Sequence, residues 1–247
     1  MTVSKLNSRA MRRASVVVGS AAAAAAICIA QAPVANAETL SGWISPTPPN
    51  AFGIVHLGQS TIINSPSTVA ETRIWTSFGS QAQPGTIGAQ ARLFKSGALC
   101  EATNYQYNTQ YTPSHTVRTS GADCGTGWYN SHGFISVWDP GASANDYLTF
   151  PTDPLYFDLA SGDSERSAPQ SSIDSIVEAG VNAQGQSYGS AEGAEDASDI
   201  PDLVAVYMTD GEIGYVIHDD LLAADSGVSL PVYKTDGVTQ IGTFDVS

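Results

Sequence analysis

Alternating apolar and polar residues run from Ile87 to Leu93, and this period of two is typical of a half-buried β-strand. Further runs rich in β-branched and aromatic residues occupy 53–57, 71–78, 134–138 and 147–150. Turn-forming clusters such as Gln83-Pro84-Gly85 separate them. Because no extended helical period occurs between 38 and 158, the pattern predicts an all-β fold, an antiparallel β-sandwich or barrel.

A second β-rich pattern follows at the C-terminal end. Predicted strands at 203–208 and 213–217 flank Asp210-Gly211, and those at 230–233 and 241–246 flank Asp236-Gly237. Asp-Gly favours the type I′ turn of a tight hairpin. A short helix is expected at 218–224. We therefore predict a small β-hairpin-rich module at 176–247, joined to the sandwich of 38–158 by a Ser-, Gly- and Asp-rich linker at 159–175.

The first 37 residues have the pattern of a cleavable signal peptide. Four basic residues precede any acid, an apolar run extends from Val16 to Ala30, and Ala35-Asn36-Ala37 is an A-x-A cleavage site. The apolar run is shorter than the ~20 residues of a membrane span. We expect a secreted chain that begins at Glu38, has no membrane span after cleavage and is either released or retained at the cell wall.

Removal of the leader makes the chain strongly acidic. The mature chain keeps 6 of the 10 basic residues and all 24 acids, so its net charge is 6 minus 24, or −18. A nucleic-acid partner requires a basic footprint, which this chain lacks. The acidity is concentrated at 159–247, where 16 acids accompany 2 bases, whereas all four tryptophans lie before residue 159.

Cys100 and Cys124 are the cysteines of the mature chain. An exported chain meets oxidising conditions, so a Cys100–Cys124 disulfide is favoured over free thiols, and a zinc site would need more soft ligands.

Two segments resemble exported bacterial proteins. Residues 88–157, with Leu93-Phe94, Cys124-Gly125 and the run Tyr129 to Gly133, are similar to uncharacterised exported proteins of actinobacteria. Residues 180–247, with Tyr188-Gly189-Ser190-Ala191 and Gly214-Tyr215-Val216, resemble a tail segment that recurs in exported Gram-positive proteins and accompanies some membrane-bound peptidases of the β-lactam-sensor type. The H-E-x-x-H motif of such peptidases is absent here. Both resemblances imply an extracellular compartment and no particular activity.

One motif suggests hydrolase chemistry. Gly185-Gln186-Ser187-Tyr188-Gly189 is a G-x-S-x-G, and Asp202 or Asp210 and then His218 follow in hydrolase order. A nucleophile elbow needs a buried strand before the serine and a helix after it. The flanking sequence predicts neither, so a glycine-flanked turn is the stronger interpretation.

Two binding sites are also candidates. Tyr105 and Tyr107 share one face of a predicted strand, with Tyr111 nearby, in an Asn- and Gln-rich setting that suits stacking on sugar rings; cross-strand packing is the alternative. No cofactor is expected, although the acids Glu192, Glu195, Asp196, Asp199 and Asp202 offer oxygen ligands for calcium without EF-hand spacing.

Because the histidines are scattered and no nucleophile, base or metal set converges in the sequence, we expect a non-catalytic extracellular or cell-wall-associated interaction protein whose partner is an unknown protein or glycan. The alternatives are a carbohydrate-binding module that uses Tyr105, Tyr107 and Tyr111, and a small serine hydrolase that uses Ser187.

Overall fold

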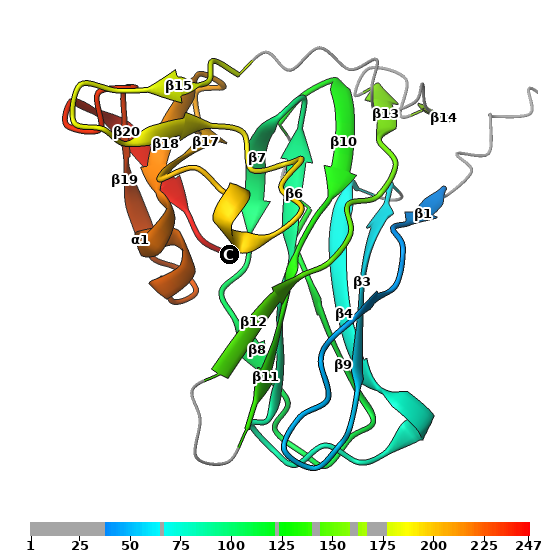
Figure 1. Cartoon of the computed structure of the whole chain (residues 1–247). Helices are drawn as coiled ribbons and strands as arrows, with labels where there is room; N and C mark the ends of the chain where they lie inside the picture. Colours follow the sequence, from blue (N-terminus) through cyan, green and yellow to red (C-terminus); the bar gives the residue numbers. More distant parts are fainter. Residues whose placement is uncertain (1–37, 65–66, 122–123, 140–143, 159–162, 167–176) are drawn as a thin grey trace, which may run out of the picture. The chain divides into compact units, whose positions relative to one another are not determined.

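The computed structural model describes residues 38–64, 67–121, 124–139, 144–158, 163–166 and 177–247 (Figure 1). The predicted signal peptide and most of the predicted linker lie outside these residues. No helix in the described part of the chain is long and apolar enough to cross a bilayer.

Strands dominate the described residues and form three sheets, without a closed barrel, so the prediction of an all-β sandwich-like fold is confirmed. The first sheet has the order β1-β3-β4-β9, with β2 on β3. Its strands are β1 (Thr39–Ser41), β2 (Ser45–Pro46), β3 (His56–Ile63), β4 (Val69–Thr76) and β9 (Ser114–Arg118). Buried and half-buried residues alternate along β3, as expected for a strand that packs on one face.

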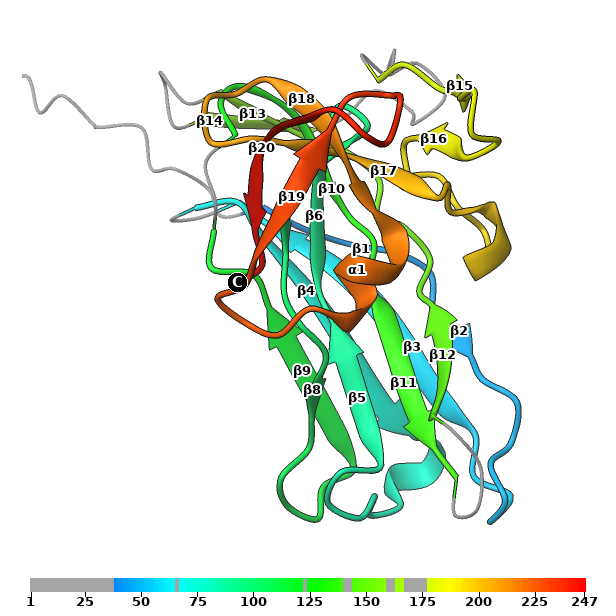
Figure 2. The ribbon, with the colours of Figure 1, turned by 90° about the vertical axis from the view of Figure 1, so that its left-hand side faces the viewer.

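The second sheet has the order β12-β11-β5-β8, and Figure 2 shows β5, β11 and β12 side by side. Its strands are β5 (Ile87–Gln90), β8 (Gln106–Tyr107), β11 (Phe134–Trp138) and β12 (Ala144–Leu148). One apolar cluster contains Ile74 and Val117 from the first sheet and Ile87, Ala89 and Ile135 from the second. These two sheets therefore pack face to face.

The third sheet continues from the sandwich into the C-terminal region, in the order β14-β13-β10-β6-β7-β17-β18-β19-β20. Its strands are β6 (Arg92–Lys95), β7 (Ala98–Ala102), β10 (Gly127–Ser131), β13 (Leu155–Asp158), β14 (Asp163–Arg166), β17 (Leu203–Tyr207), β18 (Ile213–Ile217), β19 (Ser229–Tyr233) and β20 (Gln240–Asp245). In addition, β16 (Ser187–Gly189) pairs with β17, and β15 (Gly180–Val181) pairs with β16. The parallel pair Val206 and Leu99 joins β17 to β7. The pairings of β16 and β7 with β17 are parallel, whereas the other pairings are antiparallel.

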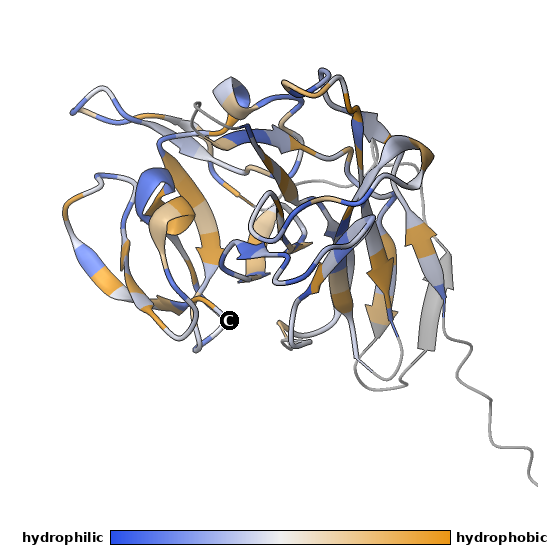
Figure 3. Ribbon diagram, turned by 90° about the horizontal axis from the view of Figure 1, so that it is seen from below, coloured by the Kyte–Doolittle hydropathy of each residue, from blue (hydrophilic) through white to orange (hydrophobic). Residues whose placement is uncertain are grey.

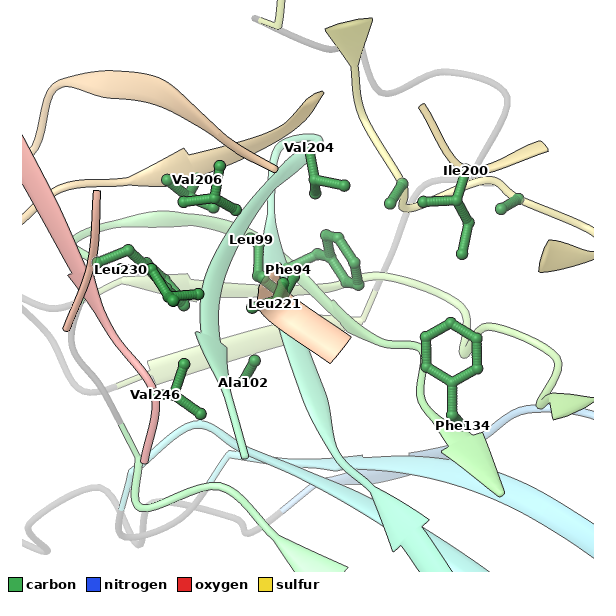
Figure 4. Packing of buried hydrophobic residues seen from close by; sticks show 14 of the residues in the cluster. Phe94, Leu99, Ala102, Phe134, Ile200, Val204, Val206, Leu221, Leu230 and Val246 are labelled. Atoms are coloured by element: carbon green, nitrogen blue, oxygen red, sulfur yellow. The ribbon is translucent and has the colours of Figure 1, made fainter. Parts of the chain in front are cut away.

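The largest apolar cluster lies between β6 and β7 and the C-terminal strands (Figure 4). Phe94 and Leu99 meet Val204, Val206 and Leu221 there; Leu221 belongs to the single α-helix described, α1 (His218–Ala223). The sheet strands in Figure 3 accordingly carry hydrophobic residues at recurring positions. Strand β14 lies within the stretch predicted as a linker, 159–175, and pairs with β13. The rest of that stretch lies outside the described residues, so the division into a sandwich and a C-terminal module stays a prediction.

Three local predictions are wrong. The run 53–57 is mostly loop, because the strand begins only at His56. The run 87–93 is two strands in different sheets, interrupted at Ala91, whose backbone amide donates to Thr103 Oγ1 at 3.0 Å. Neither Asp-Gly turn is type I′, since Gly211 and Gly237 alone have positive φ in those turns and type I′ needs two such residues.

Candidate functional site

A pocket of about 180 Å³ lies where the β2–β3 and β4–β5 connections meet the end of β11. Two aromatic residues, Phe52 and Trp138, line it together with three residues that carry side-chain amides, Asn50, Gln81 and Gln83. The strands that these connections join are labelled in Figure 1. The other lining residues are Ile54, His56, Thr76, Ala82 and Thr86. Aromatic faces combined with amide groups suit a ligand that is apolar on one face and rich in hydroxyls at its edge.

The loop that carries Phe52 is held by its own hydrogen bonds. Asn50 Oδ1 accepts from the backbone amides of Phe52 at 3.1 Å and Ile54 at 2.9 Å. Gly53 has a φ of +74°, a conformation that glycine adopts without a steric cost. The Phe52 ring remains 66 % exposed. The loop thus presents this ring outward in a fixed turn.

Trp138 is the last residue of β11 and lies beside the same loop. Its backbone amide donates to Thr86 O at 2.9 Å, and the next residue, Asp139, accepts the backbone amide of Ala51 at 3.0 Å through Oδ1. The Trp138 side chain is 40 % exposed. These bonds place two residues that are distant in sequence, Phe52 and Trp138, on one pocket.

His56 contributes a buried polar group to the pocket. Its side chain is 3 % exposed, and Nδ1 is buried with no hydrogen-bond partner among the described residues. Burial lowers the pKa of His56 below its ordinary value, although the charge of Asp139 opposes this shift. Burial thus favours the neutral form of the imidazole.

The three tyrosines predicted to bind a ligand have different environments. The Tyr105 ring packs against the largest core cluster, and burial raises the pKa of its hydroxyl, with the nearby charge of Asp146 adding to the shift. Tyr107 is 38 % exposed; its ring lies 6.2 Å from that of Tyr105, and its hydroxyl donates to Ser136 Oγ at 3.3 Å. Tyr111 is 65 % exposed and precedes Thr112, whose backbone pairs with Ala82 of the pocket. The structure brings Tyr105 and Tyr107 together and leaves Tyr111 exposed near the pocket.

Ser187 contacts an acid directly rather than a histidine. Its Oγ donates to Asp202 Oδ2 at 2.9 Å and its backbone amide donates to the same oxygen at 2.7 Å. These two bonds hold the pKa of Asp202 below its usual range. His218 lies near Asp202, with its backbone amide donating to Asp202 O at 2.9 Å, and its Nε2 is buried with no hydrogen-bond partner among the described residues. In this geometry the carboxylate of Asp202 accepts the hydrogen bond from the Ser187 hydroxyl.

The acids considered for calcium mostly bond to nearby backbone and hydroxyl groups. Asp196 caps the 3-10 turn Ala197–Asp199, and Asp199 Oδ2 accepts the backbone amides of Glu195 and Asp196 at 3.1 and 3.2 Å. Glu192 is half-buried, and burial raises its pKa to about 7. Within the described ranges, no three His, Cys, Asp or Glu side chains gather closely enough to hold a metal ion.

The disulfide prediction is confirmed. Cys100 and Cys124 are bonded, with their Cα atoms 6.0 Å apart. The bond attaches the segment before β10 to β7 in the middle of the third sheet.

Comparison of the chain with family models, with curated proteins and with solved structures finds no match. The function must accordingly be argued from the chemistry of the site.

Sequence reasoning missed Phe52 and Trp138. The available signal was an aromatic residue next to turn-forming residues, Asn50 and Gly53 in one case and Pro140-Gly141 in the other.

Proposed function

We propose that the protein is a non-catalytic extracellular binding protein whose loop-end pocket holds one ring of an uncharged sugar. The observation that carries the proposal is the pair of exposed aromatic rings, Phe52 and Trp138, beside three side-chain amides. Stacking on the apolar face of a sugar ring uses the aromatic rings, and hydrogen bonds to its hydroxyls use the amides.

Exposure of these rings to water has no benefit for folding. A buried aromatic side chain contributes through the apolar area it removes from water, whereas Phe52 leaves most of that area in solvent. Exposed aromatic residues that share a pocket are typical of a binding surface.

The charge of the chain favours an uncharged ligand. With a net charge of 6 minus 24, or −18, in the mature chain, anionic glycans and anionic surfaces are repelled. The size of the pocket also limits the ligand. Its volume of about 180 Å³ is below the ~300–1,000 Å³ of sites that enclose a drug-sized molecule, so it accommodates a single ring.

The test is titration of the mature chain, from Glu38 to Ser247, with uncharged monosaccharides and disaccharides, followed by calorimetry. Phe52→Ala and Trp138→Ala should each weaken binding by about tenfold, since one stacking contact contributes ~0.5–1.5 kcal/mol beyond its buried area. Trp43→Ala is the matched control, because Trp43 is 82 % exposed and does not line the pocket.

Circular dichroism of each variant would verify that the fold is retained. Unchanged affinity in both pocket variants would refute the proposal. Capture of a secreted protein by the wild-type surface, with no response to any sugar, would favour a protein partner instead.

A further inference from the structure

Phe78 combines an unfavourable backbone conformation with an unfavourable exposure of its apolar side chain to water. It lies in the 3-10 turn η1 (Ser77–Gly79) with φ +61° and ψ +14°, in the left-handed region that non-glycine residues avoid. Its side chain is fully exposed, at 105 % of the reference area. Glycine would remove both costs. An aromatic residue held in this way indicates a role in binding rather than in folding.

The turn that carries Phe78 is fixed at several points. Ser77 donates its backbone amide to Val55 O at 2.8 Å, and Thr76 Oγ1 donates to Ser80 O at 2.5 Å. The backbone amide of Thr76 donates to Pro113 O at 2.9 Å. The ring of Phe78 is therefore presented from a held turn, which lowers the entropy lost when a ligand binds.

A second hollow lies beside Phe78 and adjoins the sugar pocket. Its volume is about 460 Å³, and Trp75, Phe78, Arg73 and Pro113 are among its lining residues. Thr76 lines both the hollow and the pocket. The Arg73 guanidinium lies 5.2 Å from the centre of the Trp75 ring, which holds that side chain over the aromatic face. The β4–β5 connection carries Phe78 as well as Gln81 and Gln83 of the pocket, so the hollow and the pocket lie at the same end of the sandwich.

We propose that this end of the sandwich binds a chain of uncharged hexopyranose units, with one ring in the pocket and a later ring stacked on Phe78. The proposal rests on the sugar-binding function argued above and extends it from a single ring to a polysaccharide. Sugars whose ring substituents are all equatorial fit best, because they expose flat apolar faces along the chain and can stack on successive aromatic rings. A chain that makes both contacts at once binds more tightly than a single ring, since the second contact is formed within the same complex.

The experiment compares the affinity of the mature chain for single sugars and for oligomers of two, four and six units, using β-1,4-linked glucose and N-acetylglucosamine series. For the series that binds, affinity should rise by about tenfold or more between the single sugar and the longer oligomers. Phe78→Gly should abolish this rise and leave affinity for the single sugar unchanged.

Thermal unfolding supplies a readout that a structural role would not reproduce. Because glycine tolerates positive φ, Phe78→Gly should keep or raise the melting temperature while binding of the oligomers weakens. Phe78→Ala should weaken binding of the oligomers to the same extent without this backbone relief, and Trp43→Ala should change neither quantity.

Equal affinity of the wild-type chain for single sugars and six-unit oligomers would refute the extension while leaving the pocket proposal intact. Retention of the length dependence in Phe78→Gly would refute it as well. Absence of binding to every sugar in both series would overturn the pocket and its extension together.

Discussion

Glu192 should make the stability of this protein fall as the pH rises from about 4.5 to about 7. The carboxyl group is half-buried, and burial raises its pKa to about 7, with a backbone hydrogen bond from Gly97 opposing the shift only in part. In the unfolded chain the same group titrates near 4.5. Between these two values the folded state binds the proton more tightly, so folding is favoured at the lower pH and disfavoured at the higher.

The size of the effect follows from the two pKa values. Their separation corresponds to about 3 kcal/mol of unfolding free energy, at ~1.4 kcal/mol for each pH unit. The stabilising contribution is complete below pH 4.5 and is lost by pH values above 7. Glu192→Gln removes the titrating group while keeping the shape of the side chain. We therefore compare the unfolding free energy of the variant with that of wild type at each pH. The difference, variant minus wild type, should be up to about 3 kcal/mol larger at pH 8.5 than at pH 4.5.

Urea unfolding of both proteins at pH 4.5, 5.5, 6.5, 7.5 and 8.5 measures the difference directly. Histidine groups also titrate in this range; for example, burial lowers the pKa of His132 to about 3, which removes stability as the pH falls below 6.5. These contributions are common to both proteins and cancel in the difference. Glu195→Gln, at an exposed neighbouring position, is the matched control for the loss of one carboxylate. A difference between Glu192→Gln and wild type that does not vary with pH would refute the reasoning.

Three further predictions concern the disulfide, the tightly packed residue Gly133 and cleavage of the predicted signal peptide. Replacement of Cys100 and Cys124 by alanine should lower the unfolding free energy by about 3 kcal/mol, measured by urea unfolding against the wild type in the absence of reductant; an unchanged midpoint would contradict the expected role of the bond. Gly133→Ala should destabilise the fold by more than about 2 kcal/mol, because the added Cβ would lie 2.0 Å from Thr72 Oγ1; a melting temperature equal to that of wild type would show that the site can relax. Intact-mass measurement of culture supernatant should find a chain that begins at Glu38, and recovery only of the full-length chain from membranes would contradict the predicted cleavage.

Where secondary structure was local in origin, the sequence predicted it closely. The strands at 134–138 and 213–217 have the predicted bounds, and the helix expected at 218–224 is present as α1. Each of these segments carries its own pattern of apolar residues, which depends only on neighbours along the chain. The Cys100–Cys124 bond was equally predictable, since the mature chain offers a single pair of cysteines and an oxidising compartment favours their union.

The tertiary structure decided what the local patterns left open. The alternation from Ile87 to Leu93 indicated one strand, yet β5 and β6 pair with different partners, which depends on where β11 and β10 lie. The candidate site likewise depends on the tertiary structure. No sequence period connects Phe52 with Trp138, because their meeting follows from the bond between the backbone amide of Ala51 and Asp139 and from the pairing of strands far apart in the chain. Composition determined the charge and the compartment expected for this protein, whereas the placement of its exposed aromatic rings depends on long-range contacts that form only when the sheets pack.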